Sequence, residues 1–210
     1  MVEEFIKTVQ EGKGDSDQHL MTLFSIALAC KGEFYIELGV RSGTTSLPIL
    51  AAANLNGGNL ESVDLGDCPF DDDHFKREDG HKFYEHKDAI EYLEELENKM
   101  LGGRWECDKR PPDFVYIDDW HSYDHVKKEL EILDRIVTPS TVILIHDLMY
   151  GNTCPFYHTD LTLKDGQWAN GGPYRAVAEL NPQFWEFATL PWNNGLTILR
   201  KKYSNKYAQK

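Results

Sequence analysis

The chain has 210 residues and a formal net charge of −13, because 35 aspartates and glutamates outnumber 22 lysines and arginines. Apolar residues make up 41% and charged residues 27%, which is typical of a soluble globular protein, and the length suits one domain with a single core. No cluster of lysines and arginines offers the basic groove that phosphate recognition needs, so we expect neither nucleic acid nor an anionic membrane as a partner.

The sequence contains no recognisable targeting or membrane segment. Its longest nearly apolar run covers residues 20–30, about half the length of a membrane-spanning helix. The acidic N-terminus differs from the basic start of a signal peptide. The cysteines lie far apart and form no CxxC pair, which disfavours a zinc knuckle or a redox motif and predicts reduced thiols in a cytoplasmic protein. These cysteines are Cys30, Cys68, Cys107 and Cys154.

Strand and helix patterns alternate after an expected N-terminal helical segment, residues 1–31. Short apolar runs predict strands over residues 34–38, 60–63, 82–86, 113–118 and 141–145. Apolar residues at helical spacing predict helices over 44–54, 89–100, 123–136 and 174–180. The runs 184–190 and 196–200 flank a short loop and predict an antiparallel hairpin. This alternation predicts a mainly parallel sheet covered by helices on both faces.

Ligands of such sheets bind where the parallel strands end, so we expect the chemistry after Leu38, Val63, His86, Ile117 and Ile145. The irregular stretch 148–173 is rich in aromatic residues, and we expect it to be a lid over a substrate. Trp192 is expected to flank the same pocket. The acidic run 71–73 is expected to be a solvated loop, because its like charges repel one another.

A glycine-containing turn follows the first predicted strand, in the segment Glu37-Leu-Gly39-Val-Arg41-Ser42-Gly43. Glycine allows a sharp turn and a close approach of the backbone to a ligand. When a dinucleotide-binding GxGxxG motif is aligned on Gly39, its second and third glycines fall on Arg41 and Thr44, so two of the three glycines are missing. Asp64 ends the next strand, where a carboxylate accepts hydrogen bonds from ribose hydroxyls. A turn in an unrelated α/β domain is the structural alternative.

The ExGxxxG arrangement resembles the first motif of class I S-adenosylmethionine-dependent methyltransferases. The resemblance covers about residues 16–201 and implies a Rossmann-like α/β fold in one domain, residues 1–210. The sheet would be seven-stranded and mixed, with an antiparallel last strand and helices on both faces. The implied roles are an ammonium contact for Glu37, a ribose contact for Asp64 and an adenine contact near Asp88. The full implied set for S-adenosyl-L-methionine is Glu37, Gly39, Arg41, Ser42, Gly43, Asp64, Asp88, Ala89 and Asp118.

The segment 113–123, DFVYIDDWHSY, resembles the DFVFIDGDHSY signature of a small methyltransferase family that includes sugar O-methyltransferases and cephalosporin-hydroxylase-like proteins. Asp119 and Trp120 depart from that signature, in the turn that would border the acceptor. The resemblance implies that Asp118, with His146 and Asp147 after the fifth strand, binds Mg²⁺ or another divalent cation. His121 is the candidate general base, since imidazole titrates near neutral pH, with Asp118 beside it in catalysis. Asp119 is expected to be a helix N-cap, with a metal ligand as the alternative.

The expected function is S-adenosylmethionine-dependent O-methylation of a small hydroxylated acceptor, sugar-like or phenolic, with help from a divalent cation. Two alternatives stay open. One is a nucleotide-sugar or dinucleotide enzyme on a similar sheet, and the other is a non-catalytic module that binds S-adenosylmethionine. The expected partner is a small molecule, and assembly into a homo-oligomer is left open.

Overall fold

The computed structural model describes residues 2–12, 14, 16–68, 80–101, 110–149 and 171–202. Seven strands form one sheet in the order β3-β2-β1-β4-β5-β7-β6. The strands are β1 (Phe34–Leu38), β2 (Asn59–Val63), β3 (His81–Tyr84), β4 (Phe114–Ile117), β5 (Val142–His146), β6 (Trp185–Leu190) and β7 (Leu196–Lys201). The helices are α1 (Val2–Glu11), the short 3₁₀ helix η1 (Asp17–His19), α2 (Leu20–Ala29), α3 (Ser46–Asn56), α4 (Ala89–Leu101), α5 (Tyr123–Ile136) and α6 (Gly172–Ala178).

The strand directions confirm the expected mixed sheet. Strands β1 to β5 pair in parallel, whereas β7 runs antiparallel to both β5 and β6. The chain moves outward from β1 to β2 and β3 on one side, and then returns to place β4 and β5 on the other side of β1. The carboxyl ends of β1 and β4 therefore flank the topological switch point, where ligands of open α/β sheets bind.

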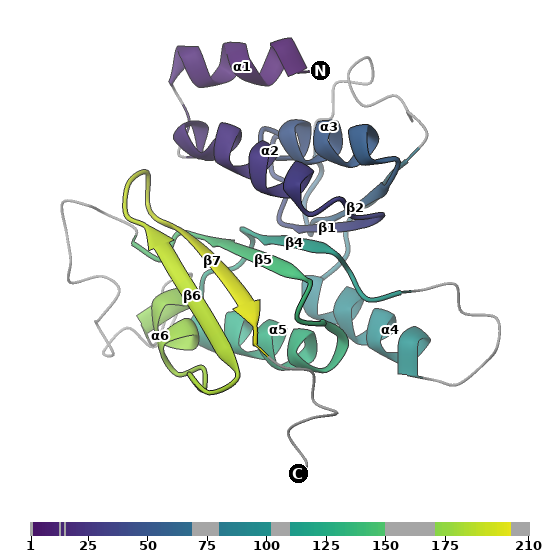
Figure 1. Ribbon diagram of the computed structural model, residues 1–210, viewed down its shortest axis with the longest axis vertical. Helices are drawn as coiled ribbons and strands as arrows, with labels where there is room; N and C mark the ends of the chain where they lie inside the picture. Colours follow the sequence, from purple (N-terminus) through teal and green to yellow (C-terminus); the bar gives the residue numbers. More distant parts are fainter. Residues whose placement is uncertain are drawn as a thin grey trace.

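Helices cover both faces of the sheet, with α1 to α3 on one face and α4 to α6 on the other (Figure 1). The side chains of β1 alternate between these layers, because successive residues of a strand point to opposite faces. Ile36 and Leu38 join the core beneath α4, α5 and α6, and Tyr35 joins the core beneath α2 and α3. Strands buried on both faces explain why the sequence shows continuous apolar runs there.

The predicted boundaries agree with the structure to within two residues, and two of the differences have a clear cause. Strand β3 is His81–Tyr84, not residues 82–86, because the chain turns at His86, whose φ is +54°. Helix α3 begins at Ser46, not at Thr44, and its N-cap residue Thr45 makes no side-chain capping bond. The Thr45 hydroxyl is bonded to Glu37 instead.

Several predicted features lie outside the described residues. They are the acidic run 71–73, most of the proposed lid 148–173, Cys107 and Cys154. Within the described part, Cys30 and Cys68 are free thiols.

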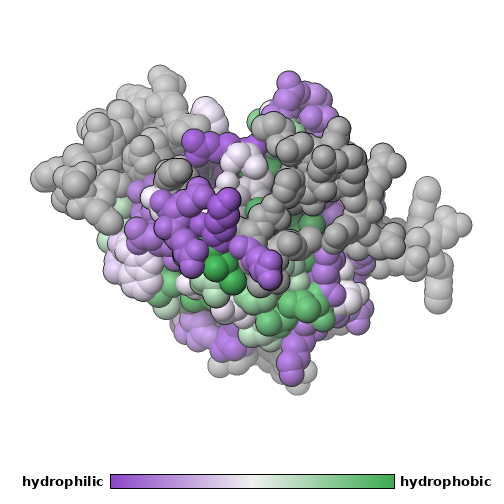
Figure 2. Space-filling view, turned by 90° about the horizontal axis from the view of Figure 1, so that it is seen from above, coloured by the Kyte–Doolittle hydropathy of each residue, from purple (hydrophilic) through white to green (hydrophobic). Residues whose placement is uncertain are grey.

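The described helices include no segment long and apolar enough to cross a lipid bilayer. The face seen in Figure 2, from above the view of Figure 1, interleaves hydrophilic and hydrophobic residues.

Candidate active site

Four polar side chains converge where β4 and β5 end. Ile117 pairs with Ile145 at the ends of these neighbouring parallel strands, so the residues that follow them meet at one edge. His121 Nε2 lies 3.3 Å from Asp118 Oδ1 and 3.1 Å from Asp147 Oδ2. His146 Nδ1 lies 3.3 Å from Asp118 Oδ1 and 3.3 Å from Asp147 Oδ1. The structure thus brings together the four residues that the sequence singled out here.

The backbone and a neighbouring tyrosine help to aim the two carboxylates. Asp147 adopts a left-handed conformation with φ of +62°, which is uncommon outside glycine and typical of functional sites. The hydroxyl of Tyr116, on β4, donates a hydrogen bond of 2.9 Å to Asp118 Oδ2. Burial, reinforced by the charge of Asp118, raises the pKa of Tyr116 well above its usual value. The tyrosine therefore remains a neutral donor to Asp118.

The charges of Asp118 and the two histidines stabilise one another, whereas burial and the charge of Asp118 raise the pKa of Asp147. Burial disfavours the charged form of His146, but the Asp118 carboxylate outweighs it and raises the pKa of His146 to about 9. Burial likewise opposes ionisation of Asp118, yet the charge of His146 and the hydrogen bond from His121 lower the pKa of Asp118. The pKa of His121 is raised by Asp118 and Asp147 against the effect of its own burial. The centre accordingly favours positive charge between its two carboxylates.

His19, from the N-terminal segment, is a further member of this region that the sequence did not indicate. Its Nε2 donates to the carbonyl oxygens of Trp192 at 2.8 Å and Asn193 at 3.2 Å. The His19 ring lies edge-on to His146, with centroids 5.5 Å apart, and stacks on Trp192 at 6.1 Å. His146 Nε2 shares the Asn193 carbonyl, at 2.9 Å. The β6–β7 loop thereby links the N-terminal segment to His146, and the expected place of Trp192 beside a pocket under the lid stays a prediction.

The glycine turn after β1 is held against the other strand ends. A Cβ atom on Gly39 would lie 2.3 Å from the carbonyl oxygen of Asp118, so only glycine fits this approach. Asp64 Oδ2, at the end of β2, accepts hydrogen bonds of 2.7 Å from the Val40 N–H and 2.9 Å from the Arg41 N–H. Although burial acts in the opposite direction, these backbone bonds lower the pKa of Asp64. The turn, Asp64 and Asp118 therefore form one continuous surface.

Glu37 lies beneath this turn and is fully buried. Its carboxylate accepts hydrogen bonds from Thr45 at 2.8 Å, Ser46 at 2.6 Å and Ser62 at 2.8 Å. Burial dominates and raises the pKa of Glu37 to about 7. The side chain joins β1, β2 and the start of α3, so it supports the turn from below. A direct contact with a ligand ammonium stays a prediction.

The remaining predicted residues border the same edge of the sheet. Asp88 Oδ1 accepts a hydrogen bond of 3.1 Å from the Glu91 N–H and so caps α4, and Ala89 begins that helix and is buried. In the glycine turn, the Gly43 N–H donates to Val40 at 2.9 Å, and Ser42 Oγ lies 3.1 Å from Thr44 Oγ1.

The predicted N-cap role of Asp119 is wrong. Ser122 caps α5, accepting a hydrogen bond of 3.3 Å from the His125 N–H, which is the favoured arrangement at a helix start. Asp119 instead faces the His125 side chain, whose Nε2 lies 2.8 Å from Asp119 Oδ2. Asp118 and Asp119 are adjacent in the chain, yet they enter different clusters.

The carboxylate cluster fits a divalent cation in its donor chemistry. Ligand atoms of Asp118, His121 and Asp147 all lie within 4.8 Å of one another. Asp147 Oδ1 is buried and receives no hydrogen bond, which leaves a lone pair for another partner. The sequence prediction chose His146 rather than His121 as the nitrogen ligand. Nε2 of His146 faces Asn193 and its Nδ1 faces the carboxylates, so His146 also lies against the site.

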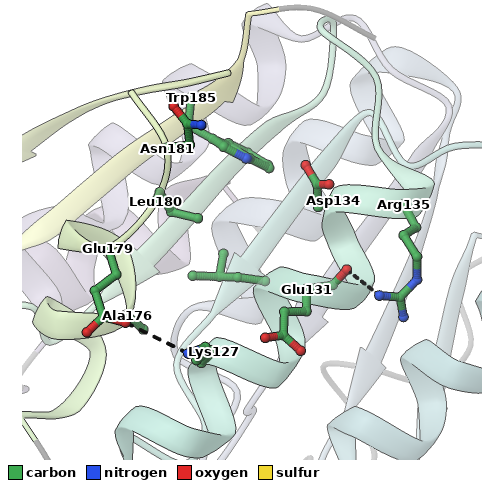
Figure 3. Close-up of a pocket in the computed structure, with 10 residues that line it drawn as sticks. Lys127, Glu131, Asp134, Arg135, Ala176, Glu179, Leu180, Asn181 and Trp185 are labelled. Atoms are coloured by element: carbon green, nitrogen blue, oxygen red, sulfur yellow. Dashed lines mark hydrogen bonds and ion pairs between the residues drawn. The ribbon is translucent and has the colours of Figure 1, made fainter. Parts of the chain in front are cut away.

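A separate surface groove of about 510 Å³ lies between α5 and α6, away from the carboxyl ends of the parallel strands (Figure 3). Several of its charged side chains are already paired: Lys127 lies 3.8 Å from Glu179, and Asp134 lies 2.9 Å from Lys201. The groove therefore lacks the convergent, buried polar groups of the cluster at the strand ends.

Residues 36–148, more than half of the chain, match a family profile described as a methyltransferase domain. A search of curated proteins gives no match. Among solved structures, an O-methyltransferase from Bacillus cereus in complex with SAH has a TM-score of 0.70 and 15% identity, covering 95% of this chain and 90% of that chain. The O-methyltransferase TomG from Streptomyces achromogenes, in complex with SAM, has a TM-score of 0.67 and 16% identity, covering 89% and 80%. An SAH-bound methyltransferase from Podospora anserina has a TM-score of 0.64 and 16% identity, covering 95% and 86%.

Proposed function

The chain belongs to the methyltransferase-domain family, and on that premise we propose that it transfers the methyl group of S-adenosyl-L-methionine to the hydroxyl oxygen of a small acceptor. The observation that carries the proposal is the convergence of two carboxylates and two histidines beside the glycine turn. His121 Nε2 lies 3.1 Å from Asp147 and 3.3 Å from Asp118 at that point. A neutral hydroxyl needs such a group to remove its proton as it attacks.

In this proposal, the turn formed by Gly39, Arg41, Ser42 and Gly43 receives the cofactor. Asp64 fixes the turn through the backbone of Val40 and Arg41 and offers its remaining acceptor capacity to ribose hydroxyls. Asp88 and Ala89, at the start of α4, border the adenine. Gly39 brings the turn against Asp118, so the cofactor and the acceptor meet at the switch point of the sheet.

At the acceptor end of the proposed site, one methyl group and one proton are transferred. A bond forms between the acceptor oxygen and the methyl carbon, and the bond between that carbon and the sulfonium sulfur breaks. The hydroxyl proton passes to His121. Asp118 and Asp147 stabilise the resulting imidazolium, since both carboxylates raise the pKa of this histidine against the effect of burial. Positioning the acceptor in line with the methyl group supplies the rest of the catalysis.

Asp118 and Asp147, with His121 or His146 as the nitrogen ligand, would hold a divalent cation. Such an ion would lower the pKa of a bound hydroxyl and orient its oxygen. A chelator separates the two versions of the proposal. Loss of turnover in chelator, restored by Mg²⁺, supports the metal-assisted version, whereas unchanged turnover leaves His121 alone as the base.

The first test is calorimetric titration of the purified protein with S-adenosylhomocysteine, followed by transfer of labelled methyl from S-adenosylmethionine into a pool of sugars and phenols. We expect binding and labelled product in the wild type. His121→Asn should retain binding and lose at least about 100-fold in turnover, the usual contribution of a general base. Binding without transfer to any acceptor favours the non-catalytic module. A heat of binding measured with a nicotinamide dinucleotide, and none with S-adenosylhomocysteine, favours the alternative of a dinucleotide-binding enzyme.

A further inference from the structure

A second cluster of potential metal ligands is formed by Asp119, in the β4–α5 loop, and by His125 and Glu129 of α5. His125 Nε2 lies 2.8 Å from Asp119 Oδ2 and 3.7 Å from Glu129 Oε1. One ligand atom from each residue lies within 4.8 Å of the other two. His125 and Glu129 are four residues apart on α5, so they occupy the same face of the helix.

Glu129 is the unusual member of this group. It is fully buried, and neither of its carboxylate oxygens has a hydrogen-bond partner. Asp119 Oδ1 is also buried and without a partner. A buried carboxylate is normally paired or bound to a metal, because leaving it unpaired costs several kcal/mol. The cluster therefore contains three buried carboxylate oxygens without a hydrogen-bond partner, and a cation is a partner that would satisfy them.

The electrostatics of the cluster also favour an added positive charge. Burial, followed by the negative charge of Asp119, raises the pKa of Glu129 well above its usual range. The charge of Asp88, just before α4, acts in the same direction on Glu129. Burial opposes the charged form of His125, but the hydrogen bond and charge of Asp119, followed by the charge of Asp88, raise the pKa of His125. The charges of Asp119 and Asp88 therefore both favour a cation at this place.

We propose that Asp119, His125 and Glu129 form a metal site that binds Zn²⁺ or Mn²⁺ and is separate from the Asp118–Asp147 cluster. One imidazole with two carboxylates is a ligand set for these ions, whereas Ca²⁺ prefers oxygen ligands alone. Two ligands bonded to one such ion at about 2.1 Å are themselves about 3 to 3.5 Å apart. The separations of 2.8 and 3.7 Å lie close to that range, so small side-chain movements would complete the site.

The position of this site gives the bound ion a structural role. Asp119 lies in the β4–α5 loop, directly after Asp118, while His125 and Glu129 belong to the first two turns of α5. An ion held by all three would fix the loop to the helix. It would thereby set the position of Asp118 and His121 without contacting any substrate.

Because the Asp118–Asp147 cluster also has metal-binding chemistry, the experiment removes that cluster first. Asp147→Asn serves as the background, and Glu129→Gln and Glu131→Gln are each added to it. Glu131 is an exposed carboxylate on the same helix and is the matched control. Bound metal is removed from each protein with a chelator, and the protein is then titrated with Zn²⁺ in competition with a chromophoric chelator. The melting temperature is measured without Zn²⁺ and with Zn²⁺ at about 100 times Kd.

We expect Asp147→Asn and the Glu131→Gln double variant to bind one Zn²⁺ per chain, with melting temperatures raised by about 5 to 10 °C. The Glu129→Gln double variant should lose that ion and the shift. Equal Zn²⁺ binding with and without Glu129 overturns the proposal, as does an Asp147→Asn protein that binds no Zn²⁺. If Glu129→Gln does not fold, His125→Asn replaces it. Neither readout depends on methyl transfer, so failure here is distinct from failure of the proposed function.

Discussion

Replacing Gly39 by alanine tests whether close packing of the glycine turn on Asp118 shapes the site. The added Cβ would lie 2.3 Å from the carbonyl oxygen of Asp118 and 2.7 Å from the amide nitrogen of Asp119. Both atoms belong to the backbone, so no side-chain rotation relieves the contact. The variant must therefore move the glycine turn away from the loop that carries Asp118.

The expected cost has two parts. Gly39 has φ of +87°, and an alanine held at positive φ costs about 1–2 kcal/mol. The steric overlap with backbone atoms adds about 1–3 kcal/mol, as for other overpacked sites. Gly57 offers a matched control, because its φ is +70° but no atom lies within 4 Å of the position that an added Cβ would occupy. Gly57→Ala should therefore be destabilised only by the cost of the positive φ, about 1–2 kcal/mol.

Urea unfolding followed by circular dichroism measures both variants. We expect Gly39→Ala to lower the free energy of unfolding by about 2–5 kcal/mol, about 1–3 kcal/mol more than Gly57→Ala. Gly39→Ala should also weaken the binding of S-adenosylhomocysteine, while Gly57→Ala leaves it unchanged. Equal losses of stability in the two variants would refute the close-packing argument.

Three further predictions concern buried or capping side chains. The pKa of Glu37, raised by burial to about 7 from 4.5, means that the folded state holds an extra proton between these pH values. The free energy of unfolding of the wild type should therefore fall as the pH rises from 4.5 to about 7. Measured by urea unfolding, the stability of Glu37→Gln relative to the wild type should rise by up to about 3 kcal/mol over that range. His81 behaves oppositely: burial lowers its pKa to about 4 from 6.5, so wild-type stability falls as pH drops through that window. His81→Asn should remove up to about 3 kcal/mol of this loss, and parallel pH profiles of variant and wild type would contradict it. Ser122→Ala should cost about 1 kcal/mol through loss of the α5 cap, measured as a lower urea midpoint with an unchanged slope.

The sequence predicted the sheet well because its signals are repeated and local. The central strands β1, β4 and β5 are buried on both faces, and the resulting apolar runs are visible without any knowledge of neighbours. The boundaries were harder to predict, since a single backbone angle ends a strand: His86, with φ of +54°, stops β3 two residues early.

The candidate site was predictable only where sheet geometry dictates proximity. Asp118 and Asp147 follow adjacent parallel strands, so their meeting follows from topology. His19 gave no such signal, because its partner Trp192 lies 173 residues away and the contact depends on how the N-terminal segment packs. The N-cap prediction for Asp119 was wrong for a related reason. An acidic residue before a helix suggests a cap, but the buried Glu129 and His125 define its environment instead.

The contact between His146 and the β6–β7 loop has a consequence for biosynthesis. Ribosomal synthesis runs from the N-terminus, and β1, β2, β4 and β5 emerge well before Asn193, the residue whose carbonyl accepts from His146 and His19. A nascent chain that already carries both carboxylates still lacks the group that anchors these two histidines. The centre is therefore completed only after the β6–β7 hairpin has been synthesised, and a chain truncated before that hairpin would have its glycine turn but no assembled site.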